Sequence, residues 1–276
     1  MRYFWVVIII GLVLLSLLTV AKTLFDRQAK SEAKQVLKTV TSDSATVIEA
    51  SELDGLPGCV AKWLERSNIV GKERIHSVYL TQQGRMRLSP EQKWIPLQAV
   101  QYINVDDPGF VWIAHARMAP FIGMSIRDMY YNGQGSMKGK LLALIPVVNA
   151  KPGPEMNQGS LLRFLAEMIW YPSAALNKYI TWEEIDENSA RATMTWQGVS
   201  ADMVFRFNEQ GDMISSLASR YQEVNGHFEL HDWGGTARGY KDFSGIRLQN
   251  KSDIIWKYET GEFNWLQIEV TNVKFN

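Results

Sequence analysis

The sequence predicts an α+β fold in which an N-terminal transmembrane helix precedes a large curled antiparallel sheet, shaped like a half-barrel, with roughly ten strands and two or three helices. Three observations predict this fold. The chain begins with an uncharged apolar run, its later part alternates apolar with polar residues, and one strongly apolar helix pattern interrupts that alternation. Alternating segments joined by short turns form antiparallel meanders, and a wide sheet curls.

The apolar run covers residues 3–20, from Tyr3 to Val20, and contains no charged side chain. As a helix with ~1.5 Å rise per residue it spans about 27 Å, close to the hydrocarbon thickness of a bilayer. It is longer than the about 7–15 apolar residues of a signal peptide, which favours an uncleaved anchor over residues 1–21. Cleavage after Thr19-Val20-Ala21 is the alternative.

The orientation of this anchor stays open at the sequence level. Basic residues are more frequent after the run than before it, which by the positive-inside rule places the large domain in the cytoplasm. Export signals also begin with a short segment that carries one arginine before a long apolar run, which favours an extracytoplasmic domain. We expect a single-pass protein of the cell membrane with an extracytoplasmic, periplasmic domain.

Residues 22–51 predict a stalk and a linker. Residues 25–41 are charged and rich in helix formers with few apolar positions, which is typical of a solvated helix, and residues 42–51 are small and polar. Residues 52–276 then form one domain, since β architectures commonly reach about 200–250 residues. Its first element is a short helix behind Pro57, because Val60, Trp63 and Leu64 recur at helical spacing.

The first half of the sheet follows. Alternation and turn signals predict strands near residues 75–88, 93–105, 110–118, 122–132 and 135–145. Residues 146–158 contain three prolines and predict an irregular connection. Residues 159–171 predict a helix with a continuous apolar face that ends at Pro172.

The last hundred residues show the clearest strand pattern. Apolar and polar residues alternate on both sides of Gly198, and a further strand ends near Tyr221. Asn225-Gly226 predicts a tight hairpin, and strands are expected near residues 227–232, 252–259 and 263–275. The glycine-rich residues 234–239 predict a turn or bulge rather than a phosphate-binding loop.

Composition and motifs exclude several classes of function. Lys plus Arg and Asp plus Glu both number 29, so no net charge attracts nucleic acid. Cys59 is the only cysteine, so it forms no intrachain disulfide and is expected as a buried thiol. His227 and His231 lie ~13 Å apart along a strand, too far to share a metal ion. Neither a nucleophile elbow nor any cofactor motif occurs, so no catalytic residue, metal or cofactor is assigned.

A curled sheet has a concave face that must be filled, and the helix over residues 159–171 is the expected plug or lid. If it fills that space only partly, an apolar ligand cavity remains. The candidate lining residues, chosen by their apolar face, are Trp112, Phe121, Met124, Tyr130, Leu165, Ile169, Trp196, Met203 and Phe205. A possible polar site comprises Asp128, Arg163 and Glu167; the last two lie one helical turn apart, as a functional pair or as an ordinary surface pair.

Three stretches resemble a bacterial family of membrane-associated proteins of unknown function: LPGCVAKWL, the span from IRDMYYNGQGSM to LLRFLAEMIWYPSAAL, and WQGV with the distal WGGT. The resemblance runs from about Leu56 to the C-terminus, and its most distinctive residues are Arg163, Glu167, Trp170, Tyr171 and Pro172. It implies a shared fold and no catalytic residue. The expected architecture is also similar to that of the periplasmic lipoprotein carriers (lipoprotein localisation factors), half-barrels that hold acyl chains under helical lids; architecture alone does not establish function.

These observations favour a membrane-anchored, non-catalytic domain that binds an apolar ligand such as a lipid, an acyl chain or a lipoprotein. A cell-envelope module that binds another protein is the first alternative. An enzyme of unrecognised class, using Asp128, Arg163 or Glu167, is the second. The sequence identifies no protein partner.

Overall fold

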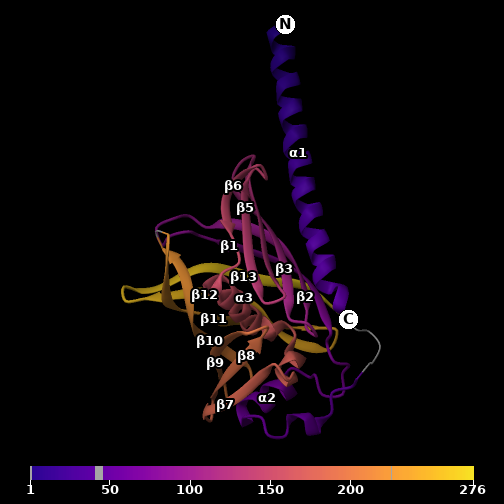
Figure 1. Ribbon diagram of the computed structural model, residues 1–276, viewed down its shortest axis with the longest axis vertical. Coiled ribbons are helices and arrows are strands. Elements are labelled where there is room, and N and C mark those ends of the chain that lie inside the picture. The colour runs from indigo at the N-terminus through magenta and orange to yellow at the C-terminus, as the bar shows by residue number, and fades with distance from the viewer. Residues whose placement is uncertain (1, 41–45, 225) are drawn as a thin grey trace.

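The computed structural model describes residues 2–40, 46–224 and 226–276, and it confirms the predicted fold class. A long N-terminal helix, α1 (Arg2–Val36), projects from a curled antiparallel sheet (Figure 1). Within the described residues this sheet has thirteen strands instead of roughly ten. Part of the expected linker, residues 41–45, and Asn225 of the expected hairpin lie outside the described residues.

The sheet consists of two meanders. The first comprises β1 (Ser77–Met86), β2 (Ile95–Asn104), β3 (Gly109–Ala119), β4 (Ile122–Tyr131), β5 (Gln134–Leu141) and β6 (Ile145–Ala150). The second comprises β7 (Ile180–Asp186), β8 (Ser189–Trp196), β9 (Val199–Phe207), β10 (Met213–Val224), β11 (His227–Phe243), β12 (Ile246–Tyr258) and β13 (Gly261–Phe275). Strand β1 pairs with β13, which joins the two meanders and leaves β6 and β7 at the edges.

Strands β6 and β7 are the two that the sequence did not predict, and both lie at edges for a physical reason. Strand β6 carries Pro146, and a residue without an N–H group is tolerated at an edge. Strand β7 carries Glu183, Glu184 and Asp186, charges that protect an edge from pairing with another chain. The predicted irregular connection over residues 146–158 was therefore wrong.

Helix α3 (Pro154–Ala166) lies on the concave face, as predicted for the plug (Figure 1). It contacts β4 and β5 on one side and β8, β9 and β10 on the other, so the sheet curls around it. The helix begins before the predicted residue 159, because Pro154 occupies a favoured first-turn position. It continues as a 3₁₀ turn over Glu167–Trp170. Leu161, Leu162 and Leu165 are completely buried.

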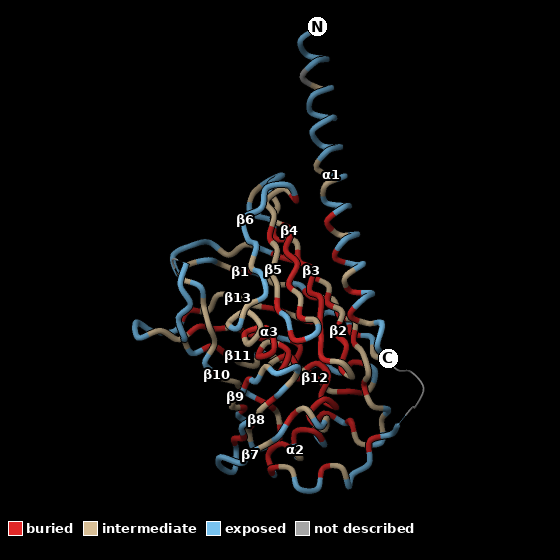
Figure 2. The backbone as a smooth tube through the Cα atoms, viewed as in Figure 1, coloured by how far each residue is buried: buried red, intermediate tan, exposed pale blue. Residues whose placement is uncertain are grey.

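The main core lies between α3 and the concave face, where the buried residues gather in Figure 2. The predicted short helix is α2 (Gly58–Arg66), which closes one end of this core. Trp63 packs against Phe207, with ring centroids 6.1 Å apart. Cys59 is buried on the same helix, as predicted.

The second half of α1 packs on the convex face of the sheet, which corrects the prediction of a solvated stalk. Ala29, Ala33 and Val36 are buried against Val111 and Ile113 of β3. The first half is different: of the described side chains in the apolar run of α1, none is buried within the protein. The helix is thus anchored on the sheet from about Phe25 onward and projects freely before it.

Two polar contacts, one to a histidine and one to an arginine, accompany this docking. Asp26 Oδ1 lies 3.1 Å from His115 Nε2, and Glu32 Oε2 lies 2.9 Å from Arg127 Nε. The Arg127 side chain is buried, so Glu32 supplies its counter-charge within the interface. These contacts fix the orientation of α1 relative to the sheet.

Candidate functional site

The predicted apolar lining residues lie mostly in the packed core. Trp112, Tyr130, Leu165, Met203 and Phe205 are buried on the concave side. The other three that contact this core are partly buried: Met124, Ile169 and Trp196. The ninth, Phe121, lies apart from them at the tip of the β3–β4 hairpin. Its side chain is 94% exposed.

The predicted polar residues Asp128, Arg163 and Glu167 come together under α3. Arg163 Nη1 lies 2.6 Å from Asp128 Oδ2, and Arg163 Nε lies 2.8 Å from Glu167 Oε1. Gln101 of β2 donates a hydrogen bond of 2.6 Å to the other oxygen of Glu167. The reading of Arg163 and Glu167 as a surface pair was wrong, because the curled sheet encloses α3 on both sides and leaves the Arg163 side chain only 14% exposed.

Burial and charge act in opposite directions in this cluster. Burial raises the pKa of Glu167 above its ordinary value, and the ion pair with Arg163 opposes that shift. Burial would lower the pKa of Arg163, but Glu167 and Asp128 together raise it, so the guanidinium remains charged. The guanidinium carbon of Arg163 also lies 4.9 Å from the centre of the Trp112 ring. The cluster therefore ties α3 to β2 and β4 from inside the core.

An open groove of about 1140 Å³ lies elsewhere, between α1 and the convex face of the sheet. Leu15, Leu18, Thr19 and Lys22 form its wall on the helix. Phe121 and Met124 line it from the β3–β4 hairpin. None of Asp128, Arg163 and Glu167 lines it.

Basic side chains exceed acidic ones in the lining of this groove. Its lysine, arginine, aspartate and glutamate residues are Lys22 on α1 and Arg85, Arg117, Arg238, Lys251, Asp253 and Glu269 on the sheet. Three of the cations have acidic partners: Lys22 pairs with Asp26, Arg238 with Asp253, and Lys251 with Glu269.

The other two cations, Arg85 and Arg117, have no acidic partner among the residues that the structure describes. Arg85 donates a hydrogen bond of 2.6 Å to the neutral Gln267, and its guanidinium lies over the Trp94 ring. Arg117 is exposed and forms no ion pair with any described residue. The groove therefore combines an apolar wall with two guanidinium groups that form no ion pair with any described residue.

Sequence reasoning missed this groove because its residues come from many distant elements and form no motif. Among the residues that line the groove, only Phe121 and Met124 were predicted to bind a ligand, and the prediction assigned both to the concave side. The available signal was the alternation of β3, which places Arg117 on the same face as Ile113 and opposite to Ala116.

His115 links the groove to the docking of α1. Its Nε2 faces Asp26, and its Nδ1 lies 3.1 Å from Ser125 Oγ. Burial lowers the pKa of His115 below its ordinary value; Lys22 acts in the same direction, and Asp26 opposes it.

A group with a depressed pKa in the folded state stabilises the fold above its unfolded pKa, and this stability is lost as the pH falls through the folded pKa. Acidification from about pH 7.5 to about pH 5.5 should thus lower the melting temperature more in the natural protein than in His115→Gln. Thermal unfolding of both proteins at the two pH values measures this. An equal decrease in both would contradict it.

Comparisons with known proteins complete the description. A search of curated proteins found no match. A putative outer membrane lipoprotein-sorting protein domain from Vibrio parahaemolyticus is similar at 10% identity and a TM-score of 0.42, over 72% of this chain and 85% of that one. A beta-barrel-like protein of the domain of unknown function DUF1849 from Brucella abortus is similar at 6% identity and a TM-score of 0.24, over 74% and 99%. Both scores are low, so neither structure contributes to the functional argument.

The family model gives a firmer result. The model described as "Family of unknown function (DUF6544)" matches residues 46–268, which is more than half of the chain. This range agrees with the resemblance that the sequence motifs indicated from about Leu56 onward. The chain therefore belongs to DUF6544, a family of unknown function.

Proposed function

We propose that this protein is a single-pass, membrane-anchored domain that binds an anionic membrane lipid in the groove between α1 and the convex face of the sheet. The observation that carries the proposal is the composition of that groove. Its helix wall belongs to the apolar run except for Lys22, and its sheet wall holds Arg85 and Arg117, which form no ion pair with any described residue. An amphiphile with a negative headgroup complements both walls.

The exposure of α1 supports the membrane anchor. None of the described side chains in its apolar run is buried, and side chains such as Leu12, Leu14 and Leu17 are more than half exposed. An apolar surface of this extent marks contact with protein or lipid, and its length matches a bilayer. The helix is continuous past Ala21 into its docked half, which supports an uncleaved anchor over residues 1–21 and a folded domain over residues 52–276. An extracytoplasmic domain remains part of the proposal.

The chemistry of the groove suits a phospholipid. Guanidinium groups bind phosphate through short, charge-assisted hydrogen bonds, often two at a time. The groove volume of about 1140 Å³ is slightly above the usual range of ligand pockets, roughly 300–1000 Å³. Since Leu15 and Leu18 lie within the apolar run, an acyl chain can enter from the bilayer without crossing water.

The groove receives more support than the concave cavity that the sequence suggested. Among the nine candidate residues only Phe121 and Met124 line the groove, and Leu165, Met203 and Phe205 are packed with α3. The enzyme alternative receives less support, because the cluster around Arg163 is buried away from the groove. The protein-interaction alternative lacks a specific observation that favours it over lipid.

The test is native mass spectrometry of the full chain purified from membranes in a mild detergent. We expect one bound anionic phospholipid. The double variant Arg85→Gln/Arg117→Gln should bind it at least about tenfold more weakly, because hydrogen bonds to charged groups contribute about 1.5–3 kcal/mol each.

The matched control is Arg191→Gln/Arg206→Gln, which removes two exposed arginines from β8 and β9, away from the groove. It should retain lipid as the natural protein does. Equal lipid retention in the groove variant, or a folded natural chain that carries no lipid, would refute the proposal.

A further inference from the structure

We propose that the tips of the β3–β4 and β5–β6 hairpins insert into the interfacial layer of the membrane that α1 spans, with a preference for anionic lipid. This makes the domain bind the membrane at a second place, separate from the helix. The inference rests on the proposed span of α1, and the experiment below separates the failure of one from the failure of the other.

The two hairpins form one apolar surface. Its exposed side chains, here called the apolar tip, are Met118, Phe121, Ile122, Leu144, Ile145 and Val147. The backbone N–H of Leu142 donates a hydrogen bond of 2.7 Å to the carbonyl oxygen of Gly123, which joins the two turns. An exposed apolar patch on a soluble surface typically marks an interaction site.

The apolar tip lies at the level where α1 leaves its apolar run. Leu15, Leu18, Phe121 and Leu142 all line the same groove, so the turns lie beside these helix residues. Figure 1 shows the β5–β6 turn next to α1, extending toward its N-terminus. Leu15 and Leu18 precede the end of the run at Val20 by a few residues, or about 3–8 Å along the helix axis at ~1.5 Å per residue. Interfacial elements bury their apolar side chains about 5–10 Å deep, a range that overlaps this one.

Three residues of the two turns have backbone φ angles that are unusual for their residue types. Phe121, Leu142 and Ala143 have φ angles of +64°, +54° and +59°, in the left-handed region that favours glycine and asparagine. Phe121 has almost no protein contact to offset that cost. Burial of its ring in lipid provides the missing stabilisation, since outliers of this kind cluster at functional sites.

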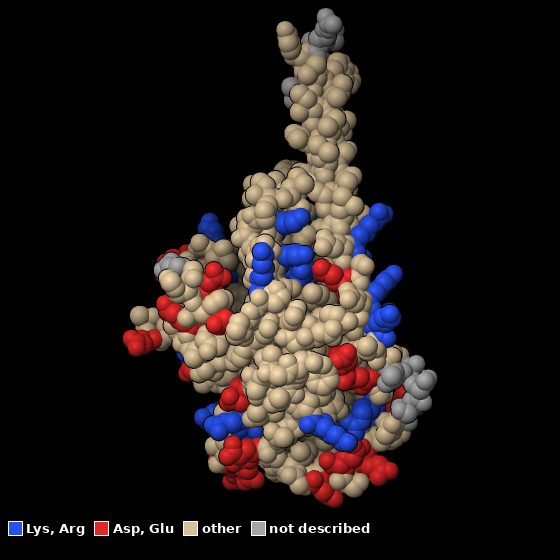
Figure 3. Space-filling view, viewed as in Figure 1, with Lys and Arg blue, Asp and Glu red and all other residues tan. Residues whose placement is uncertain are grey.

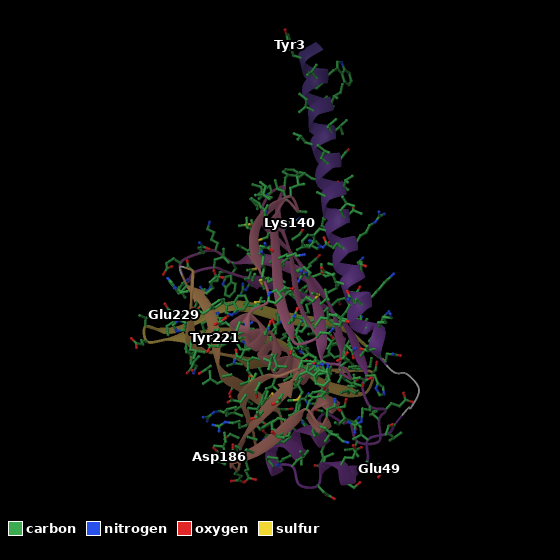
Figure 4. The ribbon with its side chains drawn as sticks, viewed as in Figure 1. Tyr3, Glu49, Lys140, Asp186, Tyr221 and Glu229 are labelled. Carbon is green, nitrogen blue, oxygen red and sulfur yellow. The ribbon has the colours of Figure 1, made fainter. Side chains whose placement is uncertain are left out.

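Charge complementarity favours an anionic surface. Residues 117–124 and 140–148 contain Arg117 and Lys140 but no acidic residue. Figure 3 shows basic side chains just below the uncharged top of the domain, and Figure 4 places Lys140 there. Basic residues adjacent to an apolar insertion bind the negative surface of anionic lipids.

The β10–β11 hairpin provides the contrast. It exposes Phe228 and Leu230, but Glu223, Glu229 and Asp232 accompany them. Figure 4 shows Glu229 on the side of the domain away from α1. Leu230 (55% exposed) is therefore a matched control for Leu144 (52% exposed).

The experiment uses the full chain in a Cys59→Ala background, with one nitroxide label each at Phe121→Cys, Leu144→Cys, Leu230→Cys or Leu14→Cys. The proteins are reconstituted in phosphatidylcholine vesicles with and without phosphatidylglycerol. Accessibility to oxygen and to a water-soluble nickel chelate reports the depth of each label. We expect labels 121 and 144 to be protected from nickel and accessible to oxygen, label 14 to lie deep, and label 230 to behave as in water.

The outcomes separate the two proposals. If label 14 is deep while labels 121 and 144 are as accessible to nickel as label 230, the tip inference is wrong and the anchor stands. If label 14 is also in water, both are wrong. If labels 121 and 144 lie equally deep without phosphatidylglycerol, the preference for anionic lipid is wrong.

A second measurement needs no substitution. Hydrogen–deuterium exchange of residues 117–124 and 140–148 in the natural chain should be slower in phosphatidylglycerol-containing vesicles than in phosphatidylcholine vesicles. Residues 223–232 should exchange equally in both. An unchanged exchange rate at the tip would overturn the inference even where a labelled variant fails to fold.

Discussion

Replacing Arg163 with methionine should lower the free energy of unfolding by about 3–5 kcal/mol. The substitution keeps most of the side-chain volume but leaves Asp128 and Glu167 buried without their shared cation. Breaking a buried ion pair by removing one partner costs far more than an exposed pair contributes, because the remaining charge is left in a medium that solvates it poorly. Chemical denaturation of the full chain in mild detergent measures the change.

Two variants control this prediction. Arg191→Met removes a cation from an exposed pair with Glu183 and should change the free energy of unfolding by no more than about 1 kcal/mol. Adding Asp128→Asn and Glu167→Gln to Arg163→Met removes the uncompensated charges and should recover part of the loss. A loss below about 1 kcal/mol in Arg163→Met itself would show that the cluster does not stabilise the position of α3.

Truncating Leu165 to alanine should lower the free energy of unfolding by about 2–5 kcal/mol. Leu165 is completely buried on α3 and belongs to the cluster that fills the concave face. The cost combines the lost apolar burial with the cavity that the surrounding side chains cannot fill. The same denaturation experiment measures it, and Leu230→Ala, on the exposed β10–β11 hairpin, should stay within about 0.5 kcal/mol of the natural protein.

The Leu165 variant also decides between two roles for the concave face. A core role predicts a large loss of stability with unchanged lipid retention in the molecules that remain folded. A ligand-lining role predicts the reverse, a small loss of stability and reduced lipid retention. Lipid retention of Leu165→Ala beside that of Arg85→Gln/Arg117→Gln therefore shows which face of the sheet binds lipid.

Local pattern was sufficient for most of the fold. The helix over Gly58–Arg66 and the strands from β1 to β5 follow from spacing, because alternation and helical periodicity are properties of neighbouring residues. The antiparallel order follows from short connections. Strands β6 and β7 escaped prediction because edge positions accept proline and acidic residues, which resemble loop signals in a sequence.

The docking of α1 on the sheet was not predicted because it depends on small residues. Ala29 and Ala33 are four residues apart and allow the helix to approach β3 closely, but two alanines among charged residues do not form an apolar stripe that hydropathy detects. The sequence accordingly predicted a solvated helix. Complementarity with Val111 and Ile113, on a strand about eighty residues later, is what buries them.

The sequence by itself determined the apolar N-terminal helix, the antiparallel half-barrel and the helix that fills it, because the pattern for each element lies in a contiguous segment. It also suggested Arg163 and Glu167 as a pair from their spacing of one helical turn. It grouped Asp128 with them as a possible polar site, but the contact itself came only from the tertiary structure, since it depends on the register of β4 beneath α3. The tertiary structure alone also assembled the groove, whose walls meet because the sheet curls and α1 lies across its convex face. Such contacts depend on the path of the whole chain, and no local pattern encodes them.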